Sequence, residues 1–139
     1  MGKALFRFFT AQHAKWYKLF GGKFLGGGDK EGAVLVVSHE GAKSGKVRST
    51  PLMHFRDGDN YLIVASAGGD SKHPGWYHNL MANPDTTINL NGQYIRVSAS
   101  DAGPRRDELW QRIVAIEPRF AKYETKTDRV IPIVVLEPR

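Results

Sequence analysis

The chain has 139 residues, a length at which one domain with a single hydrophobic core is expected. It contains no cysteine, which excludes disulfides, thiolate nucleophiles and thiolate metal sites and fits a reducing compartment. Lys and Arg number 20 against 14 Asp and Glu, and the resulting charge of +6 attracts anions such as nucleic acids, acidic lipids and phosphorylated small molecules.

Residues 4–20 are expected to form a basic amphipathic helix, because the apolar residues recur at helical spacing and most cations fall elsewhere. The same cations interrupt the apolar stretch that a secretory signal requires, so a cytoplasmic location is expected. The helix would suit acidic headgroups on the inner face of the cell membrane, although packing on the rest of the chain is the favoured alternative. A glycine-rich linker follows, which divides the chain into residues 1–28 and a single domain over residues 29–139.

The chain after the linker is dominated by strand and turn signals. Runs rich in β-branched and aromatic residues predict strands, and the pairs Asp57-Gly58 and Asn91-Gly92 predict tight hairpin turns. Pro132 indicates an edge position or a bulge in the last strand. The expected strands are Val34–His39, Thr50–Arg56, Tyr61–Ser66, Thr86–Leu90, Gln93–Ala99 and Ile131–Leu136.

Two helices are expected between these strands. Pro74 at a first helical position opens a short helix that ends near Ala82, because Asn83-Pro84 cannot continue it. A longer helix, bounded by prolines, is expected over Arg105–Glu117. About six strands, mostly in hairpins, favour a mainly β fold with added α-helices, arranged as a small antiparallel barrel.

The loop Gly41–Arg48 follows the first predicted strand and combines glycines, a hydroxyl and cations. Its backbone amides and the side chains of Lys43, Lys46 and Arg48 could converge on a phosphate. The loop is not a nucleotide-binding P-loop, because Val47 stands where that motif has Ser or Thr. A solvated basic hairpin turn explains the same residues equally well.

A second candidate segment, Trp76–Asn79, lies in the first turn of the short predicted helix. Free amides at a helix start favour negative charge, and Trp76 and Tyr77 could flank a flat ring such as isoalloxazine. For Trp76 taken alone, packing of the helix on the barrel together with Leu80 is the favoured alternative. The two segments together point to a phosphorylated cofactor that carries a ring.

Other chemistries receive less support from the sequence. The histidines at 39, 54, 73 and 78 lack metal-binding spacing, so no metal is expected, and no G-x-S-x-G elbow indicates a serine hydrolase. Exposed aromatics that alternate with basic residues, as in nucleic-acid recognition, are missing, so no nucleic acid is expected as a partner. A non-enzymatic basic binding module stays open as an alternative.

Five segments, taken in order, form a distinctive set: VLVVSHEGAKSGKVRSTPL, RDGD, VASAGG, KHPGWYHNLMANP and TDRVIPIVVLEP. This set, over about residues 30–138, resembles the deazaflavin-dependent nitroreductase and quinone reductase family of actinobacteria, which uses coenzyme F420. The resemblance implies a split β-barrel related to the FMN-binding pyridoxamine-phosphate-oxidase fold. It also implies an F420H2-dependent reductase that transfers hydride from C5 of the deazaflavin to a quinone, a nitroaromatic or an activated alkene. A barrel that binds FMN or haem is the alternative.

The resemblance also carries over site residues. The cofactor would be held by Lys43, Ser44, Arg48, Ser49, Thr50, Pro51, Leu52, Met53, Val64, Ala65, Ser66, Ala67, Lys72, Gly75, Trp76, Tyr77, His78 and Asn79. The acceptor pocket would be formed by Met53, His54, Phe120 and Tyr123. Either Tyr123 or solvent would donate the proton, and Ser66 would hydrogen-bond the ring or the acceptor. His54 alternates with Met53 and Phe55, so it should face the other side of the sheet.

Two departures from the family pattern affect these expectations. Relatives often carry basic residues where this chain has Ala42 and Ala67, so its remaining cations are expected to share the anionic groups. Tyr123 matches one residue of a substrate-facing tyrosine cluster, but Glu117 and Phe120 replace two tyrosines. Nitroimidazole activation is therefore not expected, whereas quinone reduction is. The three residues recur at spacings of three, as in a short helical turn that could close a pocket.

Overall fold

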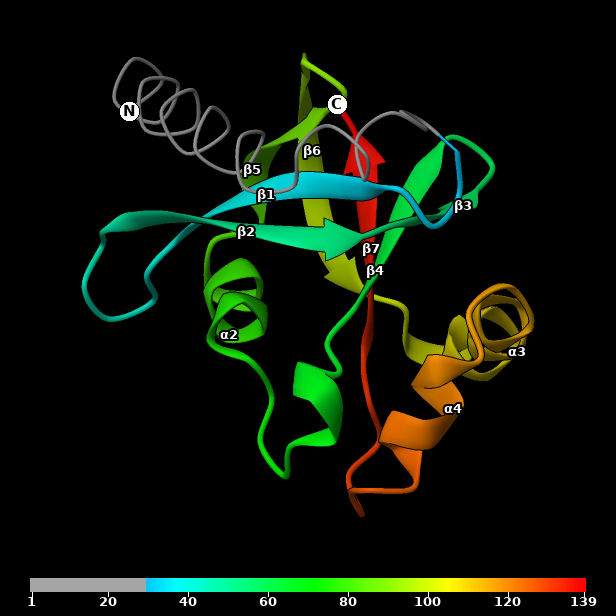
Figure 1. Ribbon diagram of the computed structural model, residues 1–139. Helices are drawn as coiled ribbons and strands as arrows, with labels where there is room; N and C mark the ends of the chain where they lie inside the picture. Colours follow the sequence, from blue (N-terminus) through cyan, green and yellow to red (C-terminus); the bar gives the residue numbers. More distant parts are fainter. Residues whose placement is uncertain (1–29) are drawn as a thin grey trace.

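The computed structural model describes residues 30–139 (Figure 1). The helix expected at residues 4–20 and the predicted boundary between residues 28 and 29 lie outside this range, so both stay predictions. No helix within the described range has the length and hydropathy that a membrane span requires.

Seven strands form one sheet in the order β2-β1-β5-β6-β7-β4-β3. Every neighbouring pair is antiparallel, as the hairpin signals predict. β2 and β4 approach one another without forming a ladder, so the sheet curls into a half-barrel (Figure 1). The strands are β1 Val34–Glu40, β2 Val47–Met53, β3 Phe55–Asp57, β4 Asn60–Val64, β5 Asp85–Leu90, β6 Gln93–Asp101 and β7 Ile133–Pro138.

The prediction of a mainly β fold with added helices is confirmed, and the additional strand arises at His54. The chain leaves the β2 ladder there, because the His54 N–H and Nδ1 both bond to the Ala33 carbonyl, at 3.0 and 2.7 Å. Met53 and Phe55 pack in one apolar cluster, whereas the His54 ring lies 5.9 Å from that of Tyr61 in the other cluster. The expected alternation of faces holds, yet His54 is fully buried because both faces are covered.

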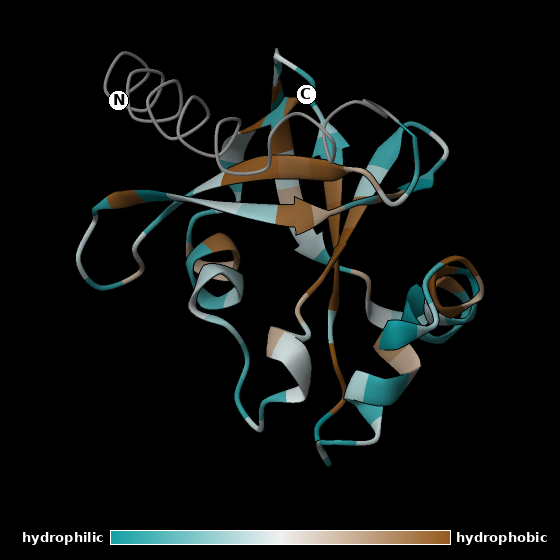
Figure 2. Ribbon diagram, in the orientation of Figure 1, coloured by the Kyte–Doolittle hydropathy of each residue, from teal (hydrophilic) through white to brown (hydrophobic). Residues whose placement is uncertain are grey.

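The two apolar clusters lie on opposite faces of β4 and β7. Alternate residues of one strand supply them: Ile63 enters the cluster beneath α2 (Gly75–Ala82), and Leu62 enters the cluster beneath α3 (Arg106–Ile116) and α4 (Arg119–Glu124). Burial on both faces explains why these strands are almost continuously apolar, as the brown ribbons of Figure 2 show. The largest anchors from the helices are Trp76, Leu80, Leu109, Trp110, Ile113 and Phe120.

β7 lies inside the sheet, between β6 and β4, so the edge position predicted from Pro132 is wrong. The strand begins at Ile133, one residue after the proline, and the ladder therefore loses no N–H donor. The Pro132 carbonyl still accepts a hydrogen bond from the Ala65 N–H at 2.9 Å. Two short 3-10 turns complete the fold: η1 at Ala67–Gly69 and η2 at Gly103–Arg105.

Candidate cofactor and acceptor site

A cavity of about 510 Å³ lies between the turn that joins β1 to β2 and the start of α2. The turn closes on itself, because the Gly41 N–H donates to the Lys46 carbonyl at 2.8 Å and the Gly45 N–H donates to the Gly41 carbonyl at 3.0 Å. Gly45 adopts φ +71°, a conformation that disfavours residues with a side chain. The lining residues are Gly41, Ala42, Lys43, Ser44, Arg48, Gly75, His78 and Asn79.

Lys43 and Arg48 give this cavity its charge. Within residues 30–139, neither cation has a carboxylate oxygen within 4.0 Å, whereas Arg105, Arg112 and Arg119 are all paired. In the part of the chain that the structure describes, no side chain caps the N-terminus of α2, whose first residue, Gly75, also lines the cavity. Unpaired cations beside uncapped helix amides provide donors for an anionic group.

A chain of hydrogen bonds runs behind the cavity and joins four segments. The Ala42 N–H donates to Asn79 Oδ1 at 2.9 Å, Asn79 Nδ2 lies 2.9 Å from His39 Nδ1, and His39 Nε2 lies 2.9 Å from Thr50 Oγ1. His39 is only 4% exposed, and burial together with the nearby Arg48 charge lowers its pKa from 6.5 to about 4. The imidazole is therefore neutral at physiological pH.

From the sequence, His39 was considered only as a metal ligand and was not predicted as a residue of the cofactor site. His39 could have been predicted from its position two residues after the fully buried Val37, because that spacing places its polar ring on the inward face of the strand. Among residues 30–139, no group of three or more metal-ligating side chains converges.

A second, smaller cavity of about 190 Å³ lies between β2, β4, η1 and α4. Ser66 and Tyr123 bring hydroxyls to it, while Leu52, Met53 and Val64 line it with apolar side chains. Arg119, which sequence reasoning did not select, also lines it; its ion pair with Glu117, at 2.6 Å, raises its pKa above the usual value. The lining residues are Pro51, Leu52, Met53, Val64, Ser66, Gly68, Arg119, Phe120 and Tyr123.

Arg129 holds the loop that carries Ser66. Its guanidinium donates to the carbonyls of Ser66 at 2.8 Å, Asp70 at 2.9 Å and Ala65 at 3.2 Å, and it also lies 2.8 Å from Nδ1 of His73. Burial, followed by the Arg129 charge, lowers the pKa of His73, which favours the neutral ring that can accept this bond. One side chain therefore fixes the shape of the loop over residues 65–73.

Several predicted site residues line neither cavity. Trp76 is 7% exposed within the apolar cluster beneath α2, and the Tyr77 hydroxyl donates to Asp101 at 2.9 Å. Their contact with a cofactor stays a prediction. The complete set outside the two cavities is Ser49, Thr50, His54, Ala65, Ala67, Lys72, Trp76 and Tyr77.

The half-barrel has the split-barrel fold of proteins that resemble pyridoxamine 5′-phosphate oxidase. A solved protein of Listeria innocua, described as a candidate pyridoxamine 5′-phosphate oxidase, superposes with a TM-score of 0.54 over 88% of this chain and 91% of that chain. Its identity of 12% shows a shared fold alone. The split-barrel prediction is thereby confirmed.

Closer relatives define the family. A family model described as F420H(2)-dependent quinone reductase matches residues 9–138. An F420H(2)-dependent quinone reductase of Mycobacterium tuberculosis is 45% identical over 109 residues, which cover 76% of this chain and 73% of the relative. A solved F420-H2 dependent reductase is 40% identical, with a TM-score of 0.67 over 75% of this chain and 93% of that chain.

The chain belongs to the F420H(2)-dependent quinone reductase family. It is an oxidoreductase whose cofactor is F420H2, as the ordered motifs predict. The first cavity fits this cofactor, because the phosphate and carboxylates of F420 match the cations Lys43 and Arg48.

Proposed function

We propose that the first cavity holds the phosphate and carboxylate tail of F420H2 and that the second admits an electrophilic acceptor, with a quinone as the main one. The observation that carries the proposal is that Lys43 and Arg48, which have no carboxylate partner within residues 30–139, line a cavity of about 510 Å³. β2 connects the two cavities, since Arg48 lines the first and Leu52 the second. A bound cofactor would therefore run along this strand, with its tail at Arg48 and its ring near Leu52.

When bound, the reduced deazaflavin supplies a hydride at C5. The protein contributes orientation and the exclusion of water, since Leu52, Met53 and Val64 present apolar surface to the second cavity. Reduction of a quinone by a hydride also consumes one proton. The Tyr123 hydroxyl is the proposed donor, resupplied from solvent, and the Ser66 hydroxyl is the proposed hydrogen-bond donor to the ring or the acceptor.

Quinones fit this pocket better than nitroimidazoles. Phe120 is 7% exposed and packs edge to face on Trp110, while Glu117 is paired with Arg119. These two positions therefore offer no phenolic hydroxyl, and Tyr123 is the single tyrosine among the lining residues of the second cavity. Nitroaromatics and activated alkenes are proposed as weaker acceptors.

The test mixes the purified protein with F420H2 and menadione and follows the return of F420 absorbance. We expect enzyme-dependent oxidation of F420H2, and an inactive protein would overturn the proposal. Replacement of Tyr123 by Phe should lower kcat by roughly 10- to 100-fold if its hydroxyl donates the proton. Tyr94→Phe, on β6 and outside both cavities, is the matched control. Equal kcat in the two variants would remove the role of Tyr123.

We also propose that residues 4–20 bring the protein to acidic membrane surfaces, where lipid-soluble quinones are found. The support is the basic and aromatic composition of this segment. Co-sedimentation of the full chain with vesicles that contain anionic lipid should exceed that with neutral vesicles. Replacement of Arg7, Lys15 and Lys18 by Gln should abolish the difference, and unchanged binding would contradict the idea.

A further inference from the structure

The hydrogen-bond chain behind the first cavity has only one consistent direction. A backbone N–H can only donate, so Asn79 Oδ1 must accept the bond from Ala42, and Nδ2 is consequently the atom that faces His39. Nδ2 can only donate, and His39 Nδ1 must therefore be unprotonated. The neutral ring then carries its hydrogen on Nε2 and donates it to Thr50 Oγ1.

This direction fixes what the Thr50 hydroxyl can do. Thr50 cannot donate to His39, because Nε2 already carries a hydrogen. Within the described part of the chain, Thr50 Oγ1 has no second hydrogen-bond partner. The O–H hydrogen of Thr50 is thus left to donate in another direction.

Thr50 lies between the two cavities. Side chains alternate along a strand, so Thr50 shares a face of β2 with Arg48 and Leu52, which line the first and the second cavity. Its hydroxyl stands where the tail region of a bound cofactor would meet the ring region. Thr50 is half-buried rather than fully enclosed.

We propose that His39 is a positioning residue for the cofactor site. Because His39 donates to Thr50, the Thr50 hydroxyl can only donate its own hydrogen toward an oxygen of the bound cofactor. His39 also holds Asn79 in the orientation in which Asn79 links the β1–β2 turn to α2. The proposal deepens the proposed function, since it requires F420 to bind along β2. The ligand group is an oxygen acceptor, either a phosphate oxygen or a ring carbonyl.

The first test needs no cofactor. Long-range ¹H–¹⁵N correlation spectra of the histidine side chains should show His39 as the neutral Nε2–H tautomer near neutral pH. The signals that disappear from the spectrum of the His39→Asn variant are assigned to His39. A protonated Nδ1, or a charged ring, would overturn the proposal whether or not the protein binds F420.

The second test measures the F420 dissociation constant for a set of variants. Thr50→Val should weaken binding by about tenfold or more, whereas Thr50→Ser should stay near wild type. His39→Asn keeps an acceptor for Asn79 but cannot reach Thr50, so it should weaken binding several-fold; His39→Gln, which can reach Thr50, should restore most of the affinity. His39→Asn should add nothing in the Thr50→Val background.

Ser38→Ala is the control, because Ser38 is the buried neighbour of His39 on the opposite face of β1 and lines neither cavity. Its affinity should match wild type. An additive effect of His39→Asn and Thr50→Val, or a Thr50→Val variant with unchanged affinity, would overturn the positioning role. Absence of F420 binding by the wild type would instead refute the proposed function and leave the tautomer test standing.

Discussion

His39 shows how one buried polar residue can link stability to pH. Its folded-state pKa is about 4, lowered from the ordinary 6.5 first by burial and second by Arg48. Between these two values the unfolded chain binds a proton that the folded protein does not accept. The contribution of His39 to the free energy of unfolding is therefore fully present above pH 6.5 and is lost as the pH falls toward 4.

Urea unfolding at pH 7.5 and at pH 5 tests this linkage. The shift of His39 corresponds to a loss of the order of 3 kcal/mol over the whole window, of which about 2 kcal/mol falls between pH 7.5 and pH 5. The His39→Gln variant should lose correspondingly less stability between the two pH values. The other titratable groups are the same in both proteins, so their contributions cancel in the comparison. An equal loss in both proteins would show that His39 is not the responsible group.

Gly69 is a second residue whose identity matters, because η1 and the end of α4 meet there. A Cβ at this position would lie 2.9 Å from the Tyr123 carbonyl oxygen and 2.9 Å from Lys126 Cβ. The backbone also has φ +88°, which disfavours a side chain. A close approach and a left-handed conformation therefore both favour glycine.

We expect Gly69→Ala to cost about 2–4 kcal/mol of unfolding free energy, from the conformational penalty and the displaced helix end. Gly68→Ala is the matched control: it has φ +64° but no atom within 4 Å of the added Cβ, so about 1 kcal/mol is expected. Urea denaturation measures both. Equal costs would mean that the contact with α4 is unimportant.

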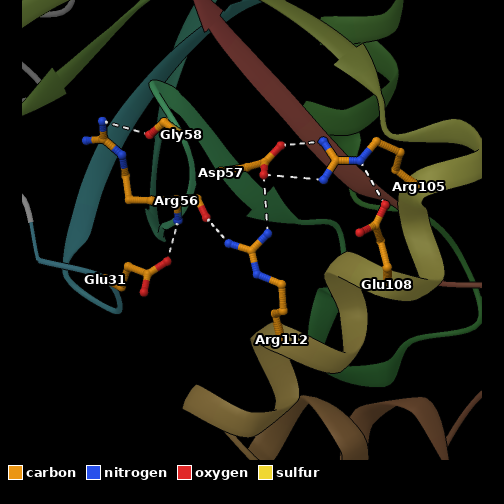
Figure 3. A network of polar contacts seen from close by, with 7 residues as sticks. All are labelled: Glu31, Arg56, Asp57, Gly58, Arg105, Glu108 and Arg112. Atoms are coloured by element: carbon orange, nitrogen blue, oxygen red, sulfur yellow. Dashed lines mark hydrogen bonds and ion pairs between the residues drawn. The ribbon is translucent and has the colours of Figure 1, made fainter.

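At the scale of elements, an ion-pair network fastens α3 to the turn between β3 and β4. Asp57, at the end of β3, accepts bonds from Arg105 at 2.5 Å and Arg112 at 3.2 Å, and Arg112 also donates to the Arg56 carbonyl at 2.9 Å (Figure 3). The Asp57 side chain is only 18% exposed. Hydrogen bonds from Arg105, and then from Arg112, lower its pKa below the usual value.

Asp57→Asn should therefore destabilise the protein by about 1–2 kcal/mol, since it removes a charge shared by two guanidinium groups. Asp59→Asn, an exposed carboxylate two residues along the same turn, should change stability by less than about 0.5 kcal/mol. Because the folded pKa of Asp57 is lowered, its contribution persists above pH 3.8 and disappears as the pH falls through the folded value. Thermal unfolding of both variants at pH 7 and at pH 3 measures the difference, and equal destabilisation at pH 7 would contradict the role of the network.

For the whole molecule, local sequence signals predicted the hairpins well. Asn91 and Gly92 have φ of +52° and +88°, as a tight turn between two strands requires, and Gly58 has φ +60°. The observed strands differ from the predicted ones where distant contacts intervene. The hydrogen bond between His54 and Ala33 separates β2 from β3. The position of β7 within the sheet depends on its pairing with β4 and β6. A single sequence gives no direct indication of such pairings.

The candidate site was predictable only in part. Lys43, Ser44, Arg48 and Asn79 were found through the ordered motifs and share the first cavity. His39 and Arg129 were not predicted as site residues, because their hydrogen-bond partners lie far away in the sequence. Asn79 is 40 residues from His39, and the partners of Arg129 are 56 to 64 residues away. Their polar side chains become informative only once the strands and loops are brought together.

The central claim is that the cavity at the β1–β2 turn binds the anionic part of F420. The most direct measurement is the F420 dissociation constant of Arg48→Gln beside that of Arg96→Gln, which removes the same charge from an exposed site on β6 outside both cavities. We expect roughly 10- to 100-fold weaker binding for Arg48→Gln and nearly unchanged binding for Arg96→Gln. Equal dissociation constants for the two variants would contradict the central claim.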